Sequence, residues 1–253
     1  MRVNSRALYG LAVVVLAAVV IGSQAPTVSD WLTGSKARQE IPVLDDSGAT
    51  TSSVEATVNA YNGFAYDLYR RYSAGDGNIL FSPYSVSTAL SMTYEGARGE
   101  TADEMEAVFG FPEDPSERLP AAARIYNTLN GGGCDYALHT VNALWLQQNY
   151  AVLEDYVDAI SGYYGGDANV LDFVAEPEES RLIINEWVEE RTNQRIKDLF
   201  PPGSIDADVR LVLTNAIYFK GDWLYEFDEE ATSAEEFHVT PSTVVEADMM
   251  SLH

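Results

Sequence analysis

Residues 209–219, a long apolar strand pattern, constrain the fold more than any other feature. Alternate positions of this stretch form one apolar face, which only Asn215 interrupts. A second stretch, residues 136–146, is apolar at both odd and even positions, which is typical of a strand that is covered on two faces. The two patterns predict strands inside a sheet, and such a sheet needs other elements packed against it.

Helical periodicity surrounds these strands. Apolar residues recur every three or four positions over residues 54–72, after a candidate capping box at Ser52 and Glu55. Ser82 and Pro83 predict the start of the next helix, because serine caps free N–H groups and proline fits the first turn. Since helices and strands do not alternate strictly, the predicted fold class is α+β and not doubly wound α/β. Further helices are expected at 102–109, 116–130, 153–164 and 178–200, and short strands at 78–81 and 169–173.

The charge balance and the lack of certain residues exclude several functions. Asp and Glu outnumber Lys and Arg 39 to 15, for a net charge of −24. Such a surface repels phosphate backbones, so we expect no nucleic-acid partner. The single cysteine, Cys134, excludes a cysteine-based zinc site, and the three histidines show no metal-ligand spacing. Because no motif for a nucleophile or a cofactor occurs either, we expect no enzyme activity, no metal and no cofactor.

The first 53 residues have a different character from the rest. Two arginines in residues 1–6 precede an uncharged segment at 7–21. As a helix this segment would span about 22 Å, short of the roughly 30 Å hydrocarbon core, so residues 1–22 are interpreted as a signal peptide or signal anchor. Residues 23–53 are expected to form a flexible Ser/Thr/Pro-rich tether to a folded domain at 54–253. The chain is therefore expected to be secreted or tethered to the outer face of the cell membrane.

Four blocks of sequence, taken in order, resemble one protein family. The blocks are residues 78–92 (NILFSPYSVSTALSM), 96–105 (GARGETADEM), 185–189 (NEWVE) and 213–223 (LTNAIYFKGDW). Together with the later pair Met249-Met250, they resemble the serpins, which are serine protease inhibitors, in a prokaryotic or archaeal-like and secreted form. The resemblance implies a serpin-like multi-helix N-terminal part and a large mixed or antiparallel sheet.

The serpin resemblance implies suicide inhibition of a serine protease, or in some members of a cysteine protease. The protease cuts an exposed reactive loop, and the loop then inserts into the large sheet as a new strand and traps the acyl-enzyme. The partner of the complete protein would be that protease. Non-inhibitory binding or a structural role on the cell surface, as a remnant of a serpin, is the alternative.

The resemblance also implies roles for four residues. Ser82, Ser85 and Asn215 match the shutter, a polar cluster beneath the point where the sheet opens. Trp223 matches the breach, where insertion begins. From the residues alone, Ser82 is a helix cap, Asn215 a satisfied core amide and Trp223 a large core aromatic.

Serpin reactive loops lie well beyond the Met-Met pair, whereas this chain stops at His253. We therefore expect an incomplete sheet, no reactive centre within residues 1–253, and no inhibition by this chain alone.

Overall fold

The computed structural model describes residues 11–15, 41–75, 77–131, 136–192, 194–221 and 223–251. The chain divides into two compact units, residues 1–220 and residues 221–253. The first unit combines helices with a four-stranded sheet, and the second is a two-stranded hairpin. The predicted α+β class is therefore confirmed.

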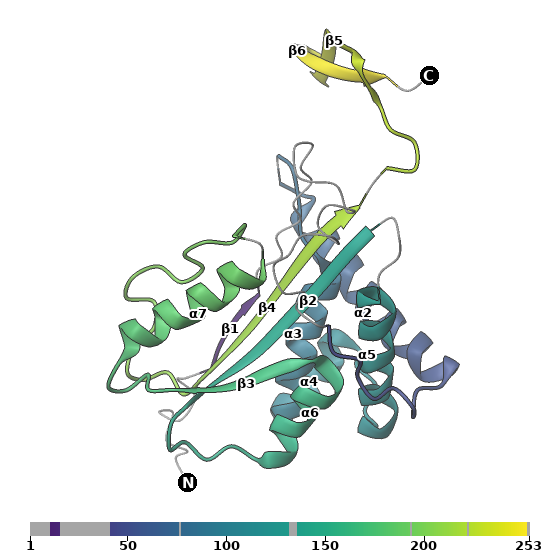
Figure 1. The fold of residues 1–253 in the computed structure, drawn as a ribbon. Coiled ribbons are helices and arrows are strands. Elements are labelled where there is room, and N and C mark those ends of the chain that lie inside the picture. The colour runs from purple at the N-terminus through teal and green to yellow at the C-terminus, as the bar shows by residue number, and fades with distance from the viewer. Residues whose placement is uncertain are drawn as a thin grey trace. The chain divides into compact units, whose positions relative to one another are not determined.

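The sheet of the first unit has the strand order β1–β4–β2–β3 (Figure 1). Neighbours β1 and β4 are parallel, as are β2 and β3. The Gln147 N–H donates to the Arg210 carbonyl while Asn142 lies opposite Asn215, so β2 and β4 run antiparallel. The two apolar stretches of the sequence are therefore adjacent strands of one mixed sheet. The strands are β1 (Leu11–Val15), β2 (Tyr136–Gln147), β3 (Gly166–Leu171) and β4 (Leu211–Gly221).

The helices of this unit begin at side-chain caps in three cases. Thr50 and Ser53 form the capping box of the first helix. The predicted capping box of Ser52 and Glu55 is therefore wrong, because both residues lie inside that helix. Ser82 caps the second helix as predicted, and Asp114 caps α5 through a 2.8 Å bond from the Ser116 N–H. The helices are α2 (Thr51–Tyr72), α3 (Pro83–Gly96), α4 (Glu100–Phe109), α5 (Pro115–Asn130), α6 (Glu154–Tyr164) and α7 (Pro177–Arg191).

Alternate residues of β2 and β4 face two different layers. Leu144 and Leu213 belong to a core that also contains residues of α3, α5 and α6. Ala143, Trp145 and Val212 belong to a second core, shared with α7 and the segment after it. Figure 1 accordingly shows α7 on the side of the sheet away from α3, α5 and α6. Both faces of this strand pair are covered, as the apolar pattern of residues 136–146 predicts.

Three predicted elements differ from the structure. The helix expected at 178–200 ends at Arg191, and Gln194 and Asp198 beyond it have left-handed backbone (φ 61° and 49°), which an α-helix does not contain. The strand expected at 169–173 lies earlier, at Gly166–Leu171. Residues 78–81 form no strand, because no described strand pairs with them.

The expected N-terminal segments are covered only in part. Residues 11–15 form β1 beside β4, and the rest of the proposed signal segment lies outside the described residues. Residues 41–50, within the stretch expected to be a tether, pack against α5. Leu44 is buried beside Tyr126, and its N–H and carbonyl bond the Asn127 side-chain amide at 2.9 Å each. The packed domain therefore begins before residue 54. None of the described helices is both long and apolar enough to cross a membrane.

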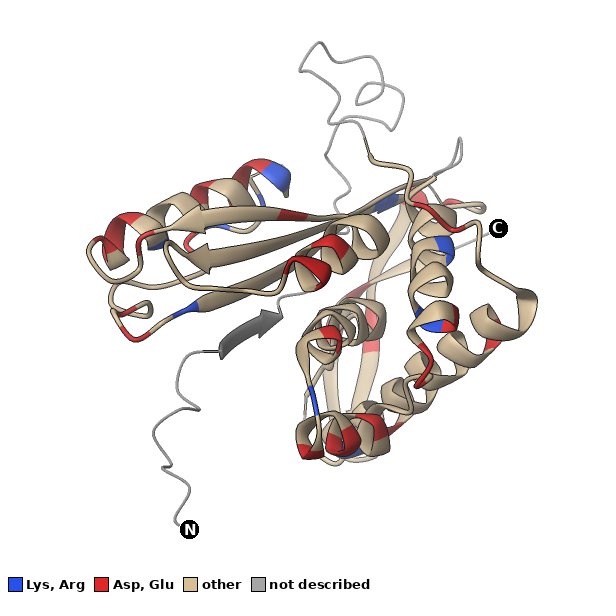
Figure 2. Ribbon diagram, turned by 90° about the horizontal axis from the view of Figure 1, so that it is seen from below, with Lys and Arg blue, Asp and Glu red and all other residues tan. Residues whose placement is uncertain are grey.

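The second unit is the hairpin of β5 (Asp228–Thr240) and β6 (Thr243–Ser251). One of its faces brings Phe237 opposite Val245, and the other brings Glu236 opposite Glu246. Its residues are mostly exposed. Acidic residues also occur on most helices of the first unit and outnumber the basic ones (Figure 2).

Two glycines of the α6 region make a matched test of this fold. Gly165 ends α6 with a φ of 64°, and a Cβ added there would lie 3.1 Å from the Tyr126 ring. We expect Gly165→Ala to destabilise the protein by roughly 1–2 kcal/mol. Gly162 lies inside α6 with open space around it, so Gly162→Ala should stabilise by about 0.5–1 kcal/mol. Denaturant unfolding of both variants is the measurement, and effects of equal sign would contradict the α6 boundary.

Candidate functional site

A chain of buried hydrogen bonds joins α3 to the centre of the sheet. The Ser85 hydroxyl donates to Asn215 Oδ1, and Asn215 Nδ2 donates to Asn142 Oδ1 at 2.6 Å. Asn142 Nδ2 in turn donates to the Tyr164 backbone carbonyl at 2.6 Å. Ser85, Asn215 and Asn142 are 0%, 3% and 1% exposed, so no solvent replaces these partners. We refer to Ser85, Asn215, Asn142 and the Tyr164 carbonyl as the buried amide chain.

Three elements position the buried amide chain. Asn142 and Asn215 share the α3 face of β2 and β4 with Leu144 and Leu213, because alternate strand residues face the same side. Ser85 lies in the first turn of α3, whose start Ser82 fixes by accepting the Ser85 N–H at 3.2 Å. Of the predicted shutter residues, the structure therefore brings Ser85 and Asn215 into contact. Ser82 contacts the backbone of Ser85 and makes no bond to Asn215.

A side-chain hydrogen bond also links β2 and β4 on the opposite face. Trp145 Nε1 donates to Thr214 Oγ1 at 3.1 Å, and both residues are buried. The Trp145 ring also meets the Trp187 ring of α7 edge to face, with centroids 5.5 Å apart. The central strand pair is therefore tied by polar side-chain contacts on both of its faces.

The buried amide chain continues into a buried ion pair. Tyr164, whose carbonyl receives Asn142, also donates its hydroxyl to Glu95 Oε1 at 2.9 Å. Glu95 accepts two 2.8 Å bonds from the Arg118 guanidinium, and both side chains are 6% exposed. Arg118 further stacks over the Tyr94 ring, 4.7 Å from its centroid. Tyr164 thus connects the sheet contact to a charged pair between α3 and α5.

The sequence pattern indicates some members of this hydrogen-bond network and gives no signal for others. Asn142 has the same signal as Asn215, a polar residue inside an apolar strand, but it is not among the predicted site residues. Glu95 and Arg118 look like ordinary surface charges of two helices, and nothing in the local pattern pairs them.

Trp223 lies in the second unit, where it is 64% exposed. Its ring meets Phe227 edge to face at 6.5 Å. Trp223 is therefore not the large core aromatic that the residue pattern alone predicts. Its role in the breach stays a prediction. Cys134 lies outside the described residues. Within the described ranges, no three His, Cys, Asp or Glu side chains are grouped so as to hold a metal ion.

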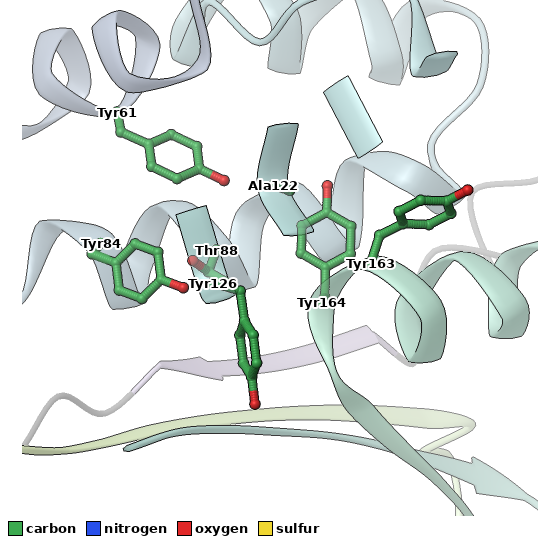
Figure 3. Close-up of a pocket in the computed structure, with 7 residues that line it drawn as sticks. All are labelled: Tyr61, Tyr84, Thr88, Ala122, Tyr126, Tyr163 and Tyr164. Carbon is green, nitrogen blue, oxygen red and sulfur yellow. The ribbon is translucent and has the colours of Figure 1, made fainter. Parts of the chain in front are cut away.

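Five tyrosines gather next to the buried amide chain (Figure 3). The space between them does not admit a water molecule, so it is a packing feature and not a ligand pocket. Burial raises the pKa of Tyr61 and of Tyr126 to about 12, and it raises the pKa of Tyr84 as well. The residues lining this space are Tyr61, Tyr84, Thr88, Ala122, Tyr126, Tyr163 and Tyr164.

Comparison with known proteins assigns the chain to a family. The sequence model described as "Serpin (serine protease inhibitor)" matches residues 59–253, well over half of the chain. The chain belongs to the serpin family. The family indicated by its sequence blocks is therefore confirmed, whereas the archaeal-like and secreted form stays a prediction.

Serpins from distant organisms cover the same part of the chain. A serpin-like protein of the archaeon Methanosarcina acetivorans is 44% identical over 195 residues, which are 76% of this chain and 46% of that protein. Human Serpin B13 is 39% identical over 203 residues, 74% of this chain and 52% of that protein. The structure of emu ovalbumin aligns with a TM-score of 0.73 and 30% identity, over 77% of this chain and 54% of that one. This serpin chain thus spans about half the length of the relatives it matches.

Removal of the central amide tests the energetics of the site. We expect Asn215→Ala to destabilise the protein by roughly 1–3 kcal/mol, because Ser85 and Asn142 each lose a buried partner. Asn169, whose amide bonds the Asp167 carbonyl in a solvent-accessible position, is the control. Its change to Ala should alter stability by no more than about 0.5 kcal/mol. Equal denaturant midpoints for the two variants would show that Asn215 contributes nothing as a buried partner.

The buried tyrosines predict a loss of stability at alkaline pH. Neutral Tyr61 is favoured in the folded state, since its pKa there is about 12 against about 10 in the unfolded chain. Its contribution to stability is therefore complete below about pH 10 and is lost as the pH rises toward about 12. Melting temperatures measured across this range, for the protein and for Tyr61→Phe, test this. The variant should lose less stability with rising pH, and identical pH profiles would refute the prediction.

Proposed function

We propose that this chain carries the sheet-opening machinery of a serpin that traps a serine protease. The observation that supports the proposal is the buried amide chain between α3 and the adjacent strands β2 and β4. The side chains of Ser85, Asn215 and Asn142 meet where α3 packs on the sheet, and they bond one another and the Tyr164 carbonyl.

An amide network suits a sheet that has two arrangements. A carboxamide carries both donors and an acceptor, so Asn215 and Asn142 can exchange partners without leaving a buried group unsatisfied. Apolar side chains at these two positions would pack in the core but would have no specific hydrogen-bond partner to exchange. A polar network with alternative pairings makes the closed and the opened sheet discrete states, and loop insertion selects the second.

The reaction that this machinery would serve is acyl trapping. The serine hydroxyl of the protease attacks a carbonyl of the reactive loop, an ester to that serine forms, and the peptide bond breaks with a new amino terminus as the leaving group. Strand insertion then carries the protease away before water hydrolyses the ester. In this scheme Trp223, just after β4, would lie where insertion begins, and the serpin acts as a substrate-like inhibitor and not as an enzyme.

Incubation with proteases tests the proposal. The whole gene product is mixed with trypsin-, chymotrypsin- and subtilisin-like proteases and run on denaturing gels. We expect a covalent complex with at least one of them, and no complex when the catalytic serine has been blocked beforehand. Residues 1–253 alone are the second control, since serpin reactive loops lie beyond the position of Met250. Cleavage of the whole product without any stable complex would favour the non-inhibitory alternative.

A further inference from the structure

Residues 41–47, which we call the arm, lie against α5 just before the start of α2. The Leu44 side chain is 7% exposed and packs with Ala123 and Tyr126 of α5. Val43 beside it is 88% exposed, so neighbouring side chains of the arm point to α5 and to solvent. The arm is therefore anchored on α5 through a buried leucine.

Two polar side chains of α5 bind the backbone of the arm. Asn127 Oδ1 accepts the Leu44 N–H and Asn127 Nδ2 donates to the Leu44 carbonyl, at 2.9 Å each. Arg124 forms an ion pair with the Asp46 carboxylate, and its Nη2 donates to the Asp46 carbonyl at 3.3 Å. In peptide recognition, main-chain hydrogen bonds give affinity and pockets for side chains give specificity. This face of α5 therefore suits a peptide in which an acidic residue follows a leucine by two positions.

The arm can leave α5 while the sheet keeps its packing. Leu44 belongs to neither of the two cores that pack on β2 and β4. Residues 48–50 link the arm to α2, and Gly48 and Thr50 of this link are exposed. The arm also precedes residues 59–253, which the serpin sequence model matches. The arm and its site are therefore separate from the sheet-opening machinery.

We propose that this face of α5 is a peptide-binding site, which the arm of a second copy of the chain can occupy in place of the chain's own arm. The structure shows the sequence of the arm on this site, so a second copy carries a matching ligand. An exchanged arm makes the same hydrogen bonds and the same ion pair, so the exchange loses no contact. The short link opposes the exchange, because it gives the chain's own arm an effective concentration on the order of 1 mM.

Two variants of the complete 253-residue chain test the exchange when they are mixed. Leu44→Asp removes the apolar anchor of the arm and leaves the site on α5 intact and empty. Asn127→Ala damages the site and releases an arm of natural sequence. The labelled Asn127→Ala chain should therefore bind the Leu44→Asp chain, and sedimentation of the labelled chain measures the dissociation constant. A synthetic peptide of residues 41–48 should displace the labelled chain.

Val43→Asp is the matched control. It adds the same charge one residue away from Leu44 and leaves the arm docked, because the Val43 side chain is exposed. We expect the labelled chain to bind Leu44→Asp at least about tenfold more tightly than Val43→Asp, whose site its own arm fills. Equal binding to both variants, or no binding to either up to about 1 mM, would overturn the proposal.

Amide hydrogen exchange of the unaltered chain provides a test that does not depend on whether the variants fold. The Leu44 N–H should exchange through a local opening that depends little on denaturant, while amides of β4 exchange by global unfolding. If the Leu44 N–H exchanges together with the amides of β4, the arm is part of the core and the proposal fails. Neither measurement involves a protease, so their failure leaves the proposed function untouched.

Discussion

The amide contact between Asn142 and Asn215 is the interaction on which the interior of this serpin chain depends. It joins two neighbouring strands beside the buried leucines Leu144 and Leu213, and it fixes the register of the strands. A shift of one residue would turn Asn142 and Asn215 toward the α7 face and would bring Ala143 and Val212 under α3. Ser85 of α3 bonds Asn215, so its contact also depends on this register. One polar contact therefore aligns β2, β4 and α3 together, which apolar packing alone does not specify.

The ion pair of Glu95 and Arg118 gives this contact a fixed frame. A buried charge is costly unless its partner and its remaining hydrogen bonds are all present. Here the carboxylate receives two guanidinium bonds and the Tyr164 hydroxyl, and Arg118 also donates to the Glu113 carbonyl at 2.8 Å. Because the Tyr164 carbonyl receives Asn142, the charged pair and the sheet contact restrain the same residue. Loss of either charge would leave the other uncompensated and would also loosen the support of the sheet.

Much of this architecture could be predicted from the sequence, and the failures have physical causes. Asn215 stood out because it breaks an apolar face, and Ser82 because a serine before a proline marks a helix start. Residues 178–200 seemed one helix because Ile196 and Leu199 continue the apolar spacing, yet Thr192 diverts the chain by binding backbone groups with its hydroxyl. Residues 78–81 have strand composition, but a strand exists only with a paired neighbour. The ion pair of Glu95 and Arg118 depends on the packing of α3 against α5, which no local sequence pattern predicts.

The buried amide chain and the hydrogen bonds to Phe200, on opposite faces of the central strand pair, join residues that lie at different distances along the sequence. On the α3 face the contacts join residues from 22 to 130 positions apart, so they form only when most of the unit is folded. On the α7 face the contacts to Phe200 join residues 15 and 19 positions apart within one segment. Local contacts can break and re-form without the loss of distant ones, whereas distant contacts of a shared network fail together. The hydrogen bonds to Phe200 can therefore break locally, whereas those of the buried amide chain break only when most of the unit unfolds.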